Sequence, residues 1–186
     1  MMKEPTHRRI DTTAFTRAGQ NLRGRDTVQD YERLMQELPA QASASALQLP
    51  ITWEVSGELR SGSGGGGLPW LHLKADVTLP LQCQRCLQPV AVKAEVDRFF
   101  RLVTTEAMAE AEDDESEEDL LVGSAEFELD VLIEDELLMS LPLVPRHDIC
   151  PTEVVLAVED GEFAAALAEK PNPFAVLQQL KRGGDQ

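Results

Sequence analysis

Two short motifs contain the residues best suited to bind a metal ion. The stretch LPLQCQRCLQPV, residues 79–90, places Cys83 and Cys86 three positions apart, and RHDIC, residues 146–150, gives His147 and Cys150 the same spacing. Zinc in proteins prefers four thiolate or imidazole ligands in a tetrahedron, and two short pairs can supply them together. One structural zinc ion held by Cys83, Cys86, His147 and Cys150 is therefore one interpretation.

The same cysteines allow other interpretations. Cysteine packs readily as a small hydrophobic residue, so the thiols can also be unliganded and partly buried. A thiol redox protein would use Cys83 and Cys86, but a thioredoxin-like CxxC opens a helix, whereas both flanks here alternate as strands do. A Cys–His nucleophile is disfavoured because nothing in the sequence orients His147 as a base. The chain has three cysteines, an odd count, which argues against a disulfide framework and favours a reducing, cytoplasmic setting.

The residues around the CxxC motif predict a β-hairpin. Apolar side chains recur at every second position from Leu71 to Leu81 and again from Val90 to Val96. The segment ITWEVSGELR, residues 51–60, alternates in the same way. Together the three runs predict an antiparallel β-meander with one face in water and the CxxC turn at one end.

Helices are predicted before and after these strands, which makes the fold class α+β. Residues 27–38 place apolar side chains on one helical face, and residues 130–140 form a central helix capped by Asp130 and ending before Pro142. Glu136 falls within the apolar arc of that helix, an arc that includes Met139. An unpaired buried charge costs several kcal/mol, roughly, so Glu136 is expected to pair with an arginine.

Composition sets the expected domain organisation of the 186-residue chain, whose formal net charge is −16. Residues 1–26 are expected to be a flexible basic arm, followed by a single domain over 27–182 and a tail at 183–186. Within the domain, SGSGGGG at 61–67 predicts a flexible loop, and residues 106–119, with nine acids and no base, predict an extended acidic loop. No apolar run is long enough to cross a membrane, and no secretory signal begins the chain.

The only clearly basic stretch lies at the start of the chain. Its arginines can pair with the acidic remainder or contact RNA phosphates, and the candidate RNA-binding residues are Arg8, Arg9, Arg17, Arg23 and Arg25. The net charge opposes binding of RNA over the whole surface, and no aromatic signature of RNA recognition stands out on the strands.

Three blocks resemble the YceD family, the large ribosomal RNA subunit accumulation proteins of bacteria. They are LPLQCQRCLQPV, IEDELLMSLPLVPRHDIC and KPNPFAVLQQLK, in this order, and the resemblance runs from about residue 30 to 182. The matching motif positions are Cys83, Cys86, Glu134, Asp135, Glu136, Leu141, Pro142, Pro145, His147, Asn172, Pro173 and Phe174. A short helix starting at Asn172 is expected in the last block.

The resemblance implies a cytoplasmic factor that is not an enzyme and that supports synthesis, processing or stability of 23S ribosomal RNA. Two hypotheses follow for its partner. Either the protein binds ribosomal RNA or its precursor through a limited basic patch, or its acidic surface docks a basic ribosomal protein or assembly factor. Neither involves a membrane or a small-molecule substrate.

Overall fold

The computed structural model describes residues 8–40, 42–61, 67–113, 116, 118–153 and 161. The chain divides into two compact units, residues 1–150 and 151–186. The elements in order are β1 (Arg9–Ile10), α1 (Thr12–Arg17), β2 (Asn21–Thr27), a 3-10 turn (Val28–Asp30), α2 (Glu32–Gln36), a second 3-10 turn (Ala46–Gln48), β3 (Pro50–Ser61), β4 (Gly67–Gln82), β5 (Pro89–Val103), α3 (Glu106–Asp113), β6 (Asp119–Val122), β7 (Phe127–Glu128) and α4 (Leu129–Ser140).

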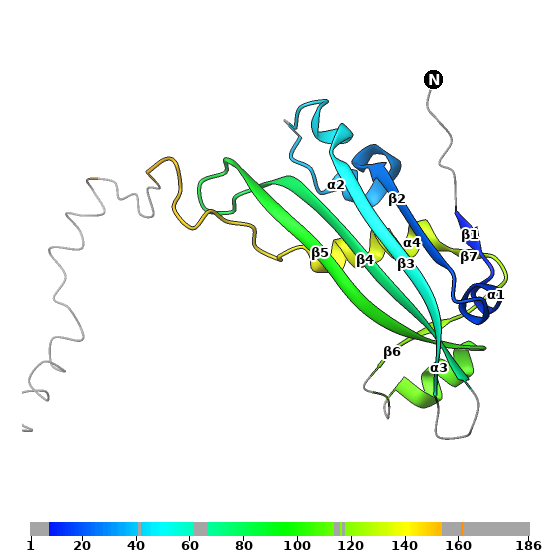
Figure 1. Cartoon of the computed structure of the whole chain (residues 1–186). Helices are drawn as coiled ribbons and strands as arrows, with labels where there is room; N and C mark the ends of the chain where they lie inside the picture. Colours follow the sequence, from blue (N-terminus) through cyan, green and yellow to red (C-terminus); the bar gives the residue numbers. More distant parts are fainter. Residues whose placement is uncertain are drawn as a thin grey trace, which may run out of the picture. The chain divides into compact units, whose positions relative to one another are not determined.

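A five-stranded sheet forms the frame of the first unit (Figure 1). Its strand order is β2-β3-β4-β5-β6, and the pairs β2–β3, β3–β4 and β4–β5 are antiparallel. The predicted meander is β3, β4 and β5, and the α+β class is confirmed. The sheet is wider than predicted, because β2 extends one edge and β6 adds a parallel strand beside β5. A separate two-stranded ladder joins β1 to β7.

The core lies between one face of this sheet and the helices. Alternate residues of β4, from Leu71 to Leu81, are buried on that face, as their period of two predicts. They pack with Phe15 of α1, Leu34 of α2 and Ile133 of α4. Met139 is an error of the prediction: it lies at the edge of the apolar arc of α4, and 63% of it is exposed.

The first 26 residues are not the flexible arm that their charge suggested, within the part that the structure describes. Helix α1 buries Phe15 against the sheet, and β2 pairs with β3 along its whole length. The physical reason is a close approach: a Cβ on Gly57 would come within 2.7 Å of Phe15 and 2.9 Å of the Thr16 backbone, so only glycine lets α1 lie this near β3.

The acidic segment also differs from its prediction. Residues 106–113 form α3 rather than an extended loop, because alanine, glutamate and methionine favour a helix. The Thr105 hydroxyl also accepts a hydrogen bond from the backbone N–H of Met108 in the first turn. Arg101 offsets part of the charge through ion pairs with Glu112 (2.7 Å) and Glu118 (3.2 Å). Among the described helices, none has the length and apolar content needed to cross a membrane.

The single helix predicted over residues 27–38 is instead a 3-10 turn followed by α2. Tyr31 separates the two with an extended backbone, at φ −126°. Thr27 donates its backbone N–H (2.9 Å) and its hydroxyl (2.8 Å) to the Asp30 carboxylate at the start of the 3-10 turn. Most of the glycine loop, residues 62–66, and the predicted helix at 172–182 lie outside the described residues, as does the tail.

Candidate metal centre

Cys83 and Cys86 lie in the turn between β4 and β5, as the alternating flanks predicted. The backbone N–H of Cys83 donates to the Gln88 carbonyl at 2.9 Å, and that of Leu87 donates to the Cys83 carbonyl at 2.9 Å. Leu87 has a φ of +61°, the left-handed conformation that closes this turn. No helix begins at the CxxC motif, so no helix N-terminus acts on its thiols.

The second pair reaches the turn along the segment that follows α4. The backbone N–H of Gln84 donates to the Pro145 carbonyl at 2.8 Å. The guanidinium of Arg85 donates from Nη2 to the carbonyls of His147 (2.7 Å) and Asp148 (3.1 Å) and from Nε to the Cys150 sulfur (3.1 Å). The CxxC turn therefore holds the HxxC segment in place through its two central residues.

The four predicted ligands meet at one point. One donor atom each from Cys83, Cys86, His147 and Cys150 lies within 4.8 Å of all the others. The sulfurs of Cys83 and Cys150 are 4.0 Å apart, and the Cys86 sulfur lies 3.4 Å from Nδ1 of His147. Zinc bonded tetrahedrally at its usual lengths would separate two sulfurs by about 3.8 Å and a sulfur from a nitrogen by about 3.5 Å. This Cys3His set fits a metal ion.

The environment of the ligands favours a cation. Burial acts to raise the pKa of Cys83, but the backbone N–H groups of Cys86, His147 and Arg85 point at its sulfur and lower the pKa to about 5. Burial raises the pKa of Cys86, and the nearby sulfurs of Cys150 and Cys83 raise it further. A bound divalent ion would favour the thiolate form of both.

The imidazole of His147 is oriented by its second nitrogen. Nε2 lies 3.0 Å from the Pro89 carbonyl, which only an N–H can satisfy. That contact leaves Nδ1, on the side of Cys86, without a proton and available as a ligand. The sequence predicted the four candidate ligands but not Arg85 or Pro89, because the roles of those two residues depend on contacts across more than fifty residues.

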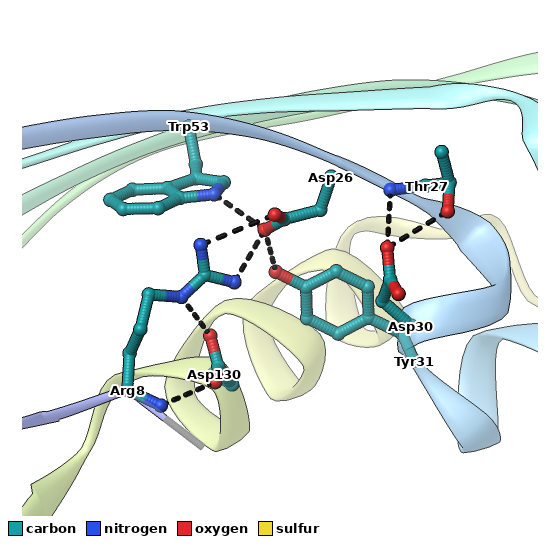
Figure 2. Close-up of polar contacts among 7 residues, drawn as sticks. All are labelled: Arg8, Asp26, Thr27, Asp30, Tyr31, Trp53 and Asp130. Atoms are coloured by element: carbon teal, nitrogen blue, oxygen red, sulfur yellow. Dashed lines mark hydrogen bonds and ion pairs between the residues drawn. The ribbon is translucent and has the colours of Figure 1, made fainter. Parts of the chain in front are cut away.

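Arg8, one of the candidate RNA-binding arginines, is held inside a network of polar contacts (Figure 2). Its guanidinium donates to Asp26 and Asp130, at 2.6 and 2.7 Å for the shortest contacts, and lies 4.6 Å from the Trp53 ring centroid. Asp26 also accepts from the Trp53 indole (2.7 Å) and the Tyr31 hydroxyl (2.9 Å). The expected helix cap at Asp130 is therefore wrong: its carboxylate instead binds Arg8 at the start of α4.

The other arginines of the candidate RNA site differ from one another. Arg9 pairs with Glu126 (3.4 Å) and Glu128 (3.2 Å). Arg17, Arg23 and Arg25 are exposed and have no carboxylate within 4 Å among the described residues. The structure thus does not gather the five arginines into one patch: Arg23 and Arg25 lie together on β2, and Arg17 lies on α1.

Comparison with known proteins bears on these motifs directly. A family model described as large ribosomal RNA subunit accumulation protein YceD matches residues 71–181, more than half of the chain. The chain belongs to the YceD family. A Haemophilus influenzae protein named Large ribosomal RNA subunit accumulation protein YceD is 37% identical over 113 residues, which are 59% of this chain and 63% of the relative. The match thus spans less than two thirds of that YceD protein, and no solved structure matches the chain.

Each acidic residue of the predicted motif on α4, Glu134, Asp135 and Glu136, contacts another part of the fold. Glu134 accepts the backbone N–H groups of Arg33 (2.7 Å) and Leu34 (3.2 Å), so it caps α2 from another helix, and Asp135 pairs with the Arg33 side chain. Glu136 is 5% exposed at its side chain and pairs with Arg98 at 3.0 Å, which is the arginine pair that the sequence predicted without naming the partner.

The remaining motif positions divide between two parts of the chain. Pro142 and Pro145 lie in the segment that leads from α4 to His147, where the Pro145 carbonyl joins the CxxC turn. The motif residues Asn172, Pro173 and Phe174 lie outside the described residues.

Proposed function

We propose that this chain supports the accumulation of 23S ribosomal RNA during large-subunit biogenesis in the cytoplasm, and that it does so by binding rather than by catalysis. The observation that carries the proposal is the match of residues 71–181 to a family described as a large ribosomal RNA subunit accumulation protein. The ligand of the proposed binding role is ribosomal RNA or its precursor.

The arrangement of the cysteines supports a role without chemistry. Four protein ligands complete a tetrahedron, as in structural zinc sites, whereas catalytic zinc sites keep one position open for water or substrate. The CxxC motif is in a β-turn, so a thioredoxin-like mechanism, with a nucleophilic thiol at a helix N-terminus, lacks its structural basis. His147 has both ring nitrogens engaged, with Cys86 and with Pro89.

One structural zinc ion at Cys83, Cys86, His147 and Cys150 is part of the proposal. Purified protein should contain about one zinc ion per chain, and Cys83→Ser should lose it. Gln84→Ala is the matched control, because it changes the neighbouring side chain and keeps the backbone N–H that binds Pro145. Elemental analysis makes the measurement, and a folded preparation without metal would overturn this part.

The experiment that tests the function is a deletion of the gene in the source organism. The ratio of 23S to 16S ribosomal RNA should fall in the deletion strain and return when the wild-type chain is expressed from a plasmid. An unchanged ratio would contradict the proposal.

The acidic surface favours a second candidate function. The chain carries 33 acidic and 17 basic residues, and α3 presents exposed carboxylates on a described helix. Such a surface suits a basic ribosomal protein or assembly factor. Affinity purification after nuclease treatment separates the two candidates, because a protein adaptor keeps its partner when RNA is removed.

A further inference from the structure

Large apolar side chains are exposed at the end of the sheet that carries the CxxC turn. Leu87, in that turn, is 63% exposed, and Leu143 and Val144, in the segment after α4, are 100% and 60% exposed. Single exposed apolar residues are normal on a protein surface, whereas several beside a groove mark a contact site for another molecule. Leu143 lines one groove at this end and Leu87 lines a second.

The first groove has a volume of about 640 Å³ and lies between the ends of α4 and β4. Its lining includes Leu38, Leu138 and Leu141, which also pack partly against the core. These three leucines give the groove a fixed apolar base, and the fully exposed Leu143 stands at its edge.

The second groove, of about 750 Å³, adjoins the first, because Pro39 and Gln82 line both. Pro80, Leu87 and Pro89 complete its apolar side. The two grooves with their exposed residues Leu87, Leu143 and Val144 are called the hairpin-end surface below.

The CxxC turn holds the walls of the hairpin-end surface in place. Gln84 and Pro145 both line the first groove, and the backbone N–H of Gln84 donates to the Pro145 carbonyl at 2.8 Å. Leu87 in the second groove donates its N–H to the Cys83 carbonyl at 2.9 Å. The surface is thus formed before a partner arrives, which limits the loss of conformational freedom on binding.

The charges of the hairpin-end surface indicate the chemistry of its occupant. Glu37 is the only charged residue among the described ones that line either groove, and it is exposed with no lysine or arginine within 4 Å of its carboxylate in the described part of the chain. RNA phosphates would therefore meet a carboxylate and no cation there. A second copy would bring a further net charge of −16 and be repelled. A basic protein that exposes apolar side chains complements both the lining and the charge.

We infer that the hairpin-end surface binds an apolar segment of a basic protein, with side chains the size of leucine or phenylalanine in the two grooves and a lysine or arginine beside Glu37. The inference rests on the second candidate function above, the protein adaptor. It adds the place where the partner binds and the apolar character of the contact.

Site-specific photocrosslinking tests the location. A benzophenone amino acid replaces Leu143 in one preparation and Leu59 in another; Leu59 is 49% exposed and pairs with Pro69, roughly 40 Å along β4 from Leu81. Each preparation is mixed with the nuclease-treated protein fraction of purified large ribosomal subunits. Position 143 should crosslink to a basic protein and position 59 should not. Equal crosslinking from both positions, or crosslinks only to a second copy or within the same chain, would overturn the inference.

The apolar contacts are tested by the affinity for the crosslinked protein, purified and measured by isothermal titration calorimetry. Leu143→Ser and Leu87→Ser should each weaken binding by about 5- to 30-fold, the effect of truncating an apolar anchor at an interface. Leu59→Ser, the matched control, should bind as the wild type does. Leu143 is fully exposed, so its substitution removes no core packing, and circular dichroism checks the fold. Wild-type affinity in both groove variants would contradict the inference.

The contact at Glu37 is tested with Glu37→Gln. The variant should bind about 2- to 5-fold more weakly at low salt, as expected for an exposed ion pair, and the difference should shrink at high salt. Glu32→Gln removes the same charge from the exposed start of α2, outside both grooves, and should have no effect. Equal losses in the two variants would show that general acidity, and no cation beside Glu37, attracts the partner.

The deletion strain separates this inference from the proposed function. If the wild-type chain restores the ratio of 23S to 16S RNA and the double variant Leu87→Ser with Leu143→Ser restores it equally, the inference is overturned while the function stands. If the wild-type chain restores nothing although the crosslink and the losses of affinity are observed, the proposed function fails and the docking surface stands.

Discussion

At the scale of single residues, the half-buried Asp26 and the buried Glu136 of this YceD protein have opposite shifts of pKa. Asp26 receives hydrogen bonds from Arg8, Trp53 and Tyr31, whereas Glu136 has Arg98 as its partner and little access to water. Burial disfavours the charged form of both carboxylates. The number of hydrogen-bond donors around each one decides whether its pKa is lowered or raised. The pKa of Asp26 is lowered and that of Glu136 is raised.

Asp26→Asn should therefore be most harmful at neutral pH. Burial acts to raise the pKa of Asp26, but its three hydrogen-bond donors and the charge of Arg8 hold it below the ordinary 3.8. The folded state binds this proton less tightly than the unfolded state, so the stabilisation exists above about pH 4 and is lost as the pH falls through the lowered pKa. We expect the variant to lose about 1–3 kcal/mol of unfolding free energy at neutral pH.

Urea unfolding at several pH values measures this. The difference between Asp26→Asn and the wild type should narrow as the pH falls below about 4. Asp76→Asn, which removes an exposed carboxylate from the sheet, serves as the control. If the difference in unfolding free energy between Asp26→Asn and the wild type stays constant on acidification, the hydrogen bonds to Asp26 do not stabilise its charged form.

Arg98→Ala should also be most destabilising at neutral pH, although the pKa of Glu136 is raised where that of Asp26 is lowered. Burial raises the pKa of Glu136 although the charge of Arg98 lowers it, so removing Arg98 raises it further. The folded state then binds the proton more tightly than the unfolded state, so stability is highest below about pH 4.5 and is lost as the pH rises through the raised pKa. The loss of thermal stability caused by Arg98→Ala, measured as the difference in unfolding temperature from the wild type, should increase from acid to neutral pH. The double variant with Glu136→Gln should lack this growth, and persistence of the trend there would refute the assignment.

At the scale of elements, the CxxC turn and the segment after α4 form one structure that no single strand or helix contains. Arg85 makes three contacts with that segment and lies beside the Cys150 sulfur. With three thiolates and one neutral imidazole, a Zn²⁺ complex would carry one negative charge, which the guanidinium compensates. Outer-shell groups of this kind change metal affinity by about 10- to 100-fold.

Arg85→Ala should lower zinc affinity by about 10- to 100-fold. The variant removes the hydrogen bonds that hold the HxxC segment and the positive charge beside the zinc complex. Competition with a coloured chelator gives the affinity, and Gln84→Ala provides the comparison within the same turn. Equal affinities for the two variants would show that Arg85 has no part in holding the ion.

The sequence predicted some elements better than others, for physical reasons. The hairpin of β4 and β5 and the buried face of α4 could be read from periodicity, since burial on one side imposes a repeat of two or of 3.6 residues. Strand β2 could not, because it is held by the distant partner strand β3. Helix α3 was missed although its residues favour a helix, because its acidic charge predicted self-repulsion, which Arg101 partly offsets. The four candidate metal ligands could be predicted from their equal spacings, whereas the contacts of Arg85, Arg33 and Arg98 form only when distant segments meet.

At the scale of the whole molecule, the acidic character is general. The formal net charge is −16, and a groove on the outer face of the sheet also holds more carboxylates than cations: Arg23, Arg25 and Lys74 against Glu54, Asp76, Glu95 and Asp97. Long-range attraction therefore favours basic protein partners, and direct contact with RNA would depend on a limited basic patch.

The ladder between β1 and β7 has a consequence for how the chain is made. Arg9 pairs with Glu128, and Arg8 reaches Asp130, so the beginning of the chain finds its partners only after some 120 further residues have been synthesised. The hairpin of β4 and β5, which needs only neighbouring residues, can form while translation continues. The N-terminal strand then closes the domain last, and a nascent chain interrupted before β7 would leave Arg8 without Asp130 and Arg9 without Glu128.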